Sequence, residues 1–465
     1  MWDLLLVNGT IITIDQDRRV IDNGFVAVQK DRIVAIGQMS ELPDIGAQKV
    51  IDCSHHVIMP GLVDAHGHGG HSLIRSLGDG RPNWEELAQT IYYECSDGEF
   101  WRAEAALAAA ERIKFGTTTA VSMIGSTPRS EYLEPLEAHF EGAISTGIRE
   151  LSGIGCPYGA FPKHAKIWDG MKLVKEYDVT PEMAHAVTEE AVRTLNGKHP
   201  RQICIVAPGR MGCRPDESVE ANIAHNRAMF EISQKYGVPL HAHAYENDVE
   251  FMKEHTPEVL NENLSLTHST KYPDSSIDIL AETGAWVFHG PSTNMHIKGH
   301  CPVYEMIKRG VNVAIVSDGS ASSRSYDLWR DMKNTLLLQR YEHKDSSLLS
   351  CGAVLEMVTI KPAKALGLEK EIGSLEVGKK ADMITIDIRQ PHLYPFQLPV
   401  TRLVNHAQGQ DIDCVIIDGE VVMKNRQLTL VDENKILDDA FEAQQMMLKR
   451  LNRPEVLINP NLYSI

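Results

Sequence analysis

The sequence lacks the marks of membrane, secreted and disulfide-rich proteins. No apolar run approaches the ~18 residues that a membrane-spanning helix needs, and residues 1–7 have neither the basic segment nor the long apolar stretch of a secretory signal. The eight cysteines are scattered without a CxxC pair, which argues against a zinc ribbon or a small disulfide framework. We therefore expect a cytoplasmic protein with free thiols and no membrane partner.

Basic residues are also scarce. The chain has 46 Lys and Arg against 63 Asp and Glu, a formal charge of −17. Such a surface repels phosphate backbones, so nucleic acid is excluded as the expected partner. A small neutral molecule fits this charge better than a phosphorylated one.

What is present is an ordinary globular composition, 43% hydrophobic and 23% charged over 465 residues. Eight strand-like runs alternate with helical patterns through the middle of the chain, and most of the helical patterns end at a glycine. The predicted strands are residues 62–66, 117–123, 147–154, 202–207, 238–243, 264–268, 285–289 and 313–318, and the clearest helices are 99–115, 222–236, 276–282 and 303–309. This count predicts an α/β fold, a (β/α)8 TIM barrel. A doubly wound sheet fits less well because no GxGxxG opens a helix.

The two chain ends carry short β segments separated by turns such as Asn8-Gly9 and Asp418-Gly419. We expect residues 1–58 and 376–465 to form one small β-sandwich domain with a C-terminal helical tail. Residues 59–375 would form the barrel inserted into it.

The first predicted barrel strand ends in a His-x-His pair, His66 and His68. Residues two apart on a strand project to the same side, so the two rings could hold one metal ion. A flexible His/Gly loop is the plain alternative.

Other ligand-type residues end other predicted strands: His243 the fifth, His268 the sixth and Asp318 the eighth. The carboxyl ends of barrel strands meet on one face, so these side chains should gather into a divalent metal site with an open position for substrate. Glu246 lies three residues past His243. Its carboxylate there is suited to proton transfer, and the alternative is a solvated charge in a loop. His268 could be a ligand, a base or a carbonyl polariser.

Three further histidines are left out of the expected site. We expect His241 to point away from His243, and we assign His71 and His289 to structural roles.

The chain resembles the amidohydrolase superfamily, in the branch of the adenosine-type and methylthioadenosine deaminases, triazine hydrolases and chlorohydrolase-like enzymes. The matching segments are PGLVDAHGH (60–68), GTTT (116–119), HAYE (243–246), His268, SDGSAS (317–322), GSL (373–375) and GKKAD (378–382). The resemblance implies that His66, His68, His243 and Asp318 bind one divalent metal. Zinc is expected first, with iron, cobalt or manganese as alternatives. The fourth predicted strand offers no lysine that could bridge a second metal.

The resemblance also implies a mechanism in which a metal-bound hydroxide attacks an sp² carbon. Asp318, with His268, would take the proton of the attacking water, and Glu246 would protonate the leaving group.

The loops expected to contact substrate differ from those of the purine-type deaminases. The fourth predicted strand is followed by APGRMGC (207–213) without a histidine, and the seventh by HGPSTNMH (289–296). We therefore expect a hydrolase that expels an amine or thiol from a urea, a carbamate or thiocarbamate, or a substituted triazine, close to the phenylurea and thiocarbamate (molinate-type) hydrolases of xenobiotic degradation. The alternatives are a deaminase of an amino-substituted heterocycle, of purine, pterin or nucleoside type, and a non-catalytic metal-binding barrel scaffold.

Four residues are candidates for the pocket lining: Trp84, Arg210 and Asn294 as substrate-binding residues, and Tyr92 beside them. Each could equally be loop or core packing. By analogy with the family, we expect a homodimer or homotetramer acting on a small-molecule substrate.

Overall fold

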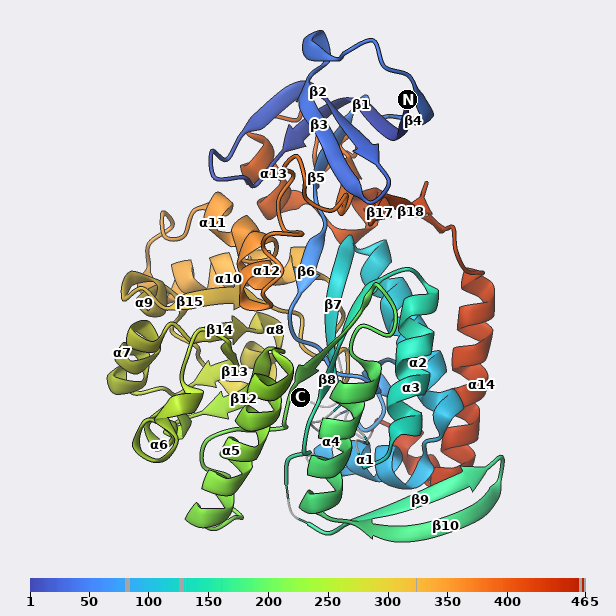
Figure 1. Ribbon diagram of the computed structural model, residues 1–465, viewed down its shortest axis with the longest axis vertical. Coiled ribbons are helices and arrows are strands. Elements are labelled where there is room, and N and C mark those ends of the chain that lie inside the picture. The colour runs from blue at the N-terminus through green and yellow to red at the C-terminus, as the bar shows by residue number, and fades with distance from the viewer. Residues whose placement is uncertain are drawn as a thin grey trace.

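The computed structural model describes residues 1–79, 84–124, 129, 131–159, 161–322, 324–459 and 462–463. A barrel forms the larger part, and a sheet made from both chain ends caps one end of it (Figure 1).

Eight parallel strands form the barrel and follow one another in chain order. They are β6 (Leu62–Asp64), β7 (Thr117–Met123), β8 (Arg149–Ile154), β11 (Gln202–Val206), β12 (Leu240–Tyr245), β13 (Leu264–Thr270), β14 (Trp286–His289) and β15 (Asn312–Ile315). Each overlaps one of the eight predicted strands. The predicted (β/α)8 barrel is confirmed.

Helices surround these strands (Figure 1). They include α1 (Trp84–Thr90), α2 (Gly98–Lys114), α3 (Leu133–Ser145), α4 (Pro181–Leu195), α5 (Val219–Tyr236), α6 (Asp248–His255), α7 (Asp274–Thr283), α9 (Val303–Lys308), α10 (Leu328–His343), α11 (Cys351–Glu356) and α12 (Ile360–Ala365). Helix α5 shows the local signals well: the Ser218 hydroxyl accepts the Ala221 N–H at its start, and Gly237 ends it with φ 61°. Among the described residues, no helix is both long and apolar enough to cross a membrane.

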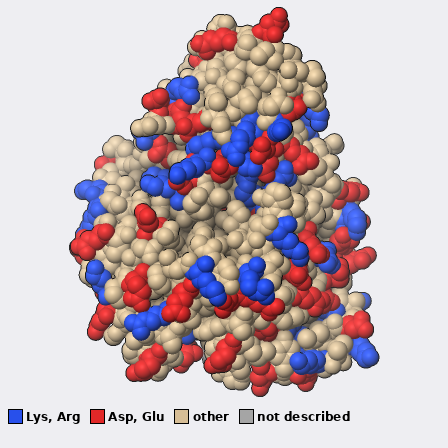
Figure 2. Space-filling model, in the orientation of Figure 1, with Lys and Arg blue, Asp and Glu red and all other residues tan. Residues whose placement is uncertain are grey.

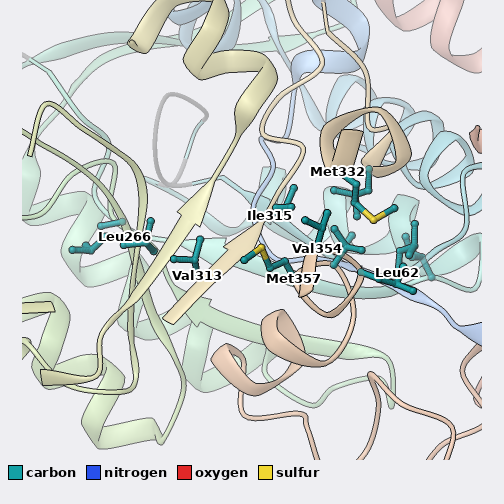
Figure 3. Packing of buried hydrophobic residues seen from close by; sticks show 14 of the residues in the cluster. Leu62, Leu266, Val313, Ile315, Met332, Val354 and Met357 are labelled. Carbon is teal, nitrogen blue, oxygen red and sulfur yellow. The ribbon is translucent and has the colours of Figure 1, made fainter. Parts of the chain in front are cut away.

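The main apolar core fills the space between the strands and the outer helices. In Figure 3, Leu266, Val313 and Ile315 of the strands lie with Met332 of α10 and Val354 of α11, and all five are fully buried. Burying a side chain of this size stabilises the fold by about 1.5–3 kcal/mol. The strand ends therefore project from a rigid base.

The barrel closes between β6 and β15 through side chains and loop backbone. The Ser317 N–H and hydroxyl both donate to the Asp64 carboxylate, and the Asp318 N–H donates to the His66 carbonyl at 3.1 Å. This closure brings Asp318, after the last barrel strand, beside His66, after the first.

The chain ends form one continuous nine-stranded sheet. Its strands are β1 (Trp2–Ile12), β2 (Val20–Gln29), β3 (Arg32–Gln38), β4 (Ala47–Asp52), β5 (His56–Pro60), β16 (Met383–Asp387), β17 (Ile412–Ile417), β18 (Glu420–Lys424) and β19 (Gln427–Leu428). Strand β5 joins the halves because it pairs with β1 on one side and β16 on the other. The sheet curls until the β17–β18 turn meets the β2–β3 turn: a Cβ on Gly419 would lie 2.1 Å from the Lys30 carbonyl oxygen.

The C-terminal tail differs from its expected place. Helix α14 (Glu433–Leu451) runs along α2 on the side of the barrel (Figure 1). Its Gln444 amide donates to the Leu73 carbonyl and its Arg450 guanidinium to the Cys95 carbonyl, at 2.7 and 3.0 Å. The tail thus packs on the barrel and not on the sheet it follows.

An antiparallel hairpin that was not predicted is formed by β9 (Lys163–Asp169) and β10 (Lys172–Val179). The sequence feature that could have predicted this hairpin is the Asp169-Gly170 turn, where Gly170 has φ 57°.

Candidate metal centre

Five side chains meet at the carboxyl ends of four barrel strands. His66 and His68 follow β6, His243 lies in β12, His268 in β13, and Asp318 follows β15. All five are buried. The convergence predicted from the strand ends is therefore present in the structure.

The ligand-type atoms lie close enough to surround one ion. The Asp318 Oδ1 is 3.1 Å from the His66 Nε2 and 3.0 Å from the His68 Nε2. One ligand atom each from His66, His68 and His243 lie within 4.8 Å of one another, as do those of His66, His268 and Asp318. Imidazole nitrogens with a carboxylate fit Zn²⁺ and similar divalent ions.

Hydrogen bonds behind the rings fix which nitrogen faces the centre. The His243 Nδ1–H donates to the Gly209 carbonyl at 2.6 Å, so its Nε2 is free to face the other ligands. The His268 Nδ1–H donates to the Asn294 Oδ1 at 3.2 Å, with the same result. Metal-binding histidines are typically held in this way.

The electrostatics suit the same assignment. Burial lowers the pKa of His243 well below its usual value and that of His268 to about 3, so both rings are neutral. Burial alone would raise the pKa of the Asp318 carboxyl, but hydrogen bonds to His66 and His68 hold it well below its usual range. Neutral imidazoles and an ionised carboxylate are the forms that bind a metal.

His241 does not point away from the site, and that expectation was wrong. Its Nε2 lies 2.7 Å from the His66 Nδ1, and its own Nδ1 contacts the Ser265 hydroxyl at 2.8 Å. Residues two apart on a strand share a face, so His241 and His243 both point into the barrel. His241 lies beneath His66 and orients it.

Glu246 is not brought to the centre. It lies in the turn after β12 with φ 46°, its side chain is 57% exposed, and its carboxylate contacts the Lys271 ammonium at 3.3 Å. The turn directs the side chain outward, so in this structure Glu246 is the solvated loop charge that the sequence left as the alternative.

Asn294 lies behind the site and not on its surface. It is 2% exposed, and its amide nitrogen donates to the His268 carbonyl at 3.2 Å, while its oxygen holds the ring of the same residue. Both ends of the amide are thus occupied by His268. The expectation that Asn294 contacts substrate is corrected to a role in positioning His268.

A cavity of about 230 Å³ opens over the cluster, and Trp84 and Arg210 line it as expected. Arg210 is pinned by two hydrogen bonds to Asp248, at 2.8 and 2.9 Å. Tyr158 and Tyr245 add aromatic surface.

Two more residues lie elsewhere than the sequence predicted. His71 lines the cavity and stacks on His68 with ring centroids 4.9 Å apart, so it is a site residue that sequence reasoning missed. The sequence feature that could have indicated this role is the position of His71 in the HGHGGH run (66–71). Tyr92 is fully buried behind Gly70 and is not part of the cavity wall.

Known proteins resemble this chain over nearly its whole length. A 5-methylthioadenosine/S-adenosylhomocysteine deaminase of Syntrophobacter fumaroxidans is 31% identical over 458 residues, covering 94% of this chain and 96% of that protein. A 5'-deoxyadenosine deaminase of Methanosarcina acetivorans is 30% identical over 480 residues, covering 97% and 100%.

Solved structures share the fold. An adenosine deaminase from Xanthomonas campestris with bound zinc has a TM-score of 0.80 at 23% identity, covering 96% of this chain and 99% of that one. An atrazine chlorohydrolase mutant from Arthrobacter aurescens, complexed with zinc and atraton, has a TM-score of 0.79 at 21% identity, covering 95% and 100%. Both of those structures hold zinc, and at these identities the likeness shows the fold.

The comparisons correct the expected chemistry. The curated relatives that are about 30% identical are named as deaminases, so the expectation of a urea, carbamate or triazine hydrolase was wrong and the deaminase alternative is favoured. A special closeness to phenylurea and thiocarbamate hydrolases stays a prediction. The Amidohydrolase family model matches residues 57–422. The chain therefore belongs to the amidohydrolase family and is a hydrolase of carbon–nitrogen bonds other than peptide bonds.

Proposed function

We propose that the protein is a hydrolytic deaminase of an adenine-type nucleoside whose 5' position carries no phosphate. The reaction replaces the exocyclic amine of the ring by oxygen from water and releases ammonia. The observation that carries this proposal is the joint presence of the buried His66, His68, His243 and Asp318 cluster and of deaminase relatives matched over almost the whole chain.

His66, His68, His243 and Asp318 would hold the metal, and His268 would stand beside it. A divalent ion bound there supplies Lewis-acid activation of water. The ionised Asp318 carboxylate accepts the proton of the attacking water and returns it to the departing amine. The neutral His268 ring is held by Asn294 through its Nδ1–H. Its Nε2 can therefore accept a hydrogen bond beside the reacting carbon.

Because Glu246 points outward, it is not the residue that protonates the leaving group, contrary to our first expectation. Its carboxylate lies beside Lys271 at the surface and not in the cavity wall. We therefore assign both proton transfers to Asp318.

The cavity walls suit a planar ring. Trp84, Tyr158 and Tyr245 supply aromatic faces, and the Arg210 guanidinium stands 5.3 Å from the centre of the Tyr245 ring. Lys298 and Glu85, paired at 3.3 Å, also line the cavity, as does Arg324, whose guanidinium donates to the Gly319 and Ala321 carbonyls. Aromatic faces beside polar groups suit a base with a small polar sugar.

The test is ammonia release by the Zn²⁺-loaded enzyme from adenosine, 5'-deoxyadenosine, 5'-methylthioadenosine and S-adenosylhomocysteine. We expect turnover of at least one of them, with loss of the adenine absorbance, and none from Asp318→Asn. Absence of ammonia from every one of these nucleosides, with at least one metal bound per chain, would overturn the proposal.

We also propose that the enzyme acts in the cytoplasm as a homodimer or homotetramer, without nucleic acid or membrane partners. Acidic and basic side chains mix over the face shown in Figure 2 and form no continuous basic track there.

On α14, the exposed Leu437 and Phe441 lie four residues apart on one face and offer an apolar contact for a second subunit. Light scattering after size exclusion measures the state directly, and a monomer would contradict the proposal.

A further inference from the structure

A second group of metal-ligand side chains lies apart from the cluster described above. It consists of Cys156, two residues after β8, His185 on α4 and His225 on α5. One ligand atom from each lies within 4.8 Å of the other two. Cys156 and His225 are buried, and His185 is half-buried. No residue of this group belongs to the proposed catalytic cluster.

The spacing of the two rings matches a shared ion. The His185 Nε2 and the His225 Nδ1 are 3.2 Å apart. Two nitrogens bound to one tetrahedral Zn²⁺ at 2.0–2.1 Å stand about 3.3 Å apart. The rings hydrogen-bond directly at this separation, and two nitrogens that share one ion would need almost no movement from it.

The ring of His225 is held so that a lone pair faces the group. Its Nε2–H donates to the Arg210 carbonyl at 3.2 Å, so the Nδ1 is the ring nitrogen that faces the group. The Nδ1 thus turns its lone pair toward His185 and Cys156, where it accepts the His185 Nε2–H, and metal-bound histidines are typically held from behind in the same way.

The donor atoms select the kind of ion. Arg214 and Lys163 stand near Cys156 and favour its thiolate. One sulfur and two imidazole nitrogens suit Zn²⁺ and similar ions, whereas Mg²⁺ and Ca²⁺ need carboxylate and carbonyl oxygens. A thiophilic ion instead gains a covalent bond to sulfur: the S–H bond breaks, a sulfur–metal bond forms, and one proton leaves to water.

We propose that Cys156, His185 and His225 form a second metal site, for Zn²⁺ or a similar thiophilic divalent ion. The site stands behind the loop that holds the catalytic cluster, since His225 bonds the Arg210 carbonyl and the adjacent Gly209 carbonyl accepts the His243 Nδ1–H. An ion there braces this loop. The proposal does not depend on the deaminase proposal, because it concerns other residues and needs no substrate.

Cobalt distinguishes the two sites because only one of them contains sulfur. The full-length protein is stripped of metal and titrated with Co²⁺, while bound metal and near-ultraviolet absorbance are measured. We expect two Co²⁺ per chain and a thiolate-to-cobalt charge-transfer band. Cys156→Ser should lose the band and one equivalent of metal. The matched control is Cys204→Ser, a buried thiol on β11 that lies outside both ligand groups, and it should keep both.

His185→Asn provides a second test on a half-buried position, in case Cys156→Ser does not fold. It removes one ligand and should weaken binding at this site at least tenfold, with the catalytic equivalent unchanged. A stoichiometry of one Co²⁺ per chain with no charge-transfer band in the unmodified protein would overturn the proposal. So would a band that persists in Cys156→Ser.

Discussion

Asp318 is the carboxylate that faces the imidazoles of the site, whereas Glu246 faces solvent. Asp318→Asn keeps the size of the side chain but removes the proton acceptor and a charged ligand. We expect kcat to fall at least about 100-fold. Glu246→Gln should change kcat less than about threefold, because its exposed ion pair with Lys271 contributes little. Steady-state ammonia release from the best nucleoside measures both.

Metal content must be measured for both variants, since loss of a ligand also lowers affinity. A few per cent of activity retained by Asp318→Asn would contradict the proposed role. A large loss in Glu246→Gln would show that the β12 turn rearranges to bring Glu246 into the cavity.

Asn294 acts through His268, and this can be separated from substrate contact. Asn294→Ala removes the amide oxygen that accepts the His268 Nδ1–H and the amide nitrogen that donates to the His268 backbone carbonyl. We expect kcat to fall about 10–100-fold, the usual cost of losing such a support, while KM changes little. A rise in KM at constant kcat would instead restore Asn294 to the substrate-binding residues. The equally buried Asn222→Ala, at the start of α5, controls for a general loss of packing.

The residue types of the site were predictable, and their orientations were only partly so. His66, His68, His243 and Asp318 could be placed together because barrel strands converge at their carboxyl ends. The outward turn at Glu246 depends on a positive φ, and the use of Asn294 depends on which polar group its amide meets. Both follow from tertiary contacts that a short stretch of sequence does not encode.

At the scale of elements, the barrel strands were predictable because each is a short apolar run followed by a helical pattern. The hairpin β9–β10 and the docking of α14 were not. The hairpin is mostly exposed and has little apolar pattern, and α14 packs on a helix over 300 residues away in sequence. The apolar face of an amphipathic helix indicates that the helix packs against another element. The pattern does not identify that element.

Between α2, α3 and β8 lies a buried polar group: Glu104, His139 and Glu150, one from each element. The His139 Nε2 is 3.6 Å from a Glu104 oxygen, and its Nδ1 is 3.9 Å from a Glu150 oxygen. Burial raises the pKa of Glu150 to about 8. The folded protein therefore keeps this carboxyl protonated at neutral pH, whereas the unfolded chain does not.

This difference sets a pH dependence of stability. Below the unfolded pKa near 4.5 both states are protonated and Glu150 has no effect. As pH rises from there to about 8, only the folded state holds the proton, so its stability falls. Glu150→Gln removes the term, and we expect it to be more stable than the parent by a few kcal/mol at pH 8.

Urea unfolding at pH 5, 6.5 and 8 measures this effect. The advantage of Glu150→Gln should shrink steadily toward pH 5. A difference independent of pH would show that Glu150 is ionised in the folded protein. Glu141→Gln, on the exposed side of α3, is the control.

At the scale of the molecule, catalysis and stability lie at opposite ends of the barrel. The metal cluster stands at the carboxyl ends of the strands, while the terminal sheet meets their amino ends. There Arg149, the first residue of β8, pairs with Asp382 and with Asp418 of the sheet, the latter at 2.6 Å. Arg201 also binds Asp418, at 2.9 Å. These ion pairs join barrel and sheet where no substrate reaches.

Arg149→Met tests this division. The change leaves the buried Asp382 without its counter-charge, which costs about 3–5 kcal/mol, whereas Asp418 keeps Arg201. Arg102→Met, which breaks exposed pairs with Glu99 and Glu141, should cost no more than about 1 kcal/mol. Urea unfolding gives both values, and kcat of the folded fraction should stay within twofold of the parent, about 0.4 kcal/mol in the barrier. Arg149→Met with unchanged stability would contradict the role of these pairs in joining barrel and sheet. A large loss of kcat in a folded Arg149→Met would instead mean that the sheet controls the geometry of the metal cluster through the barrel strands.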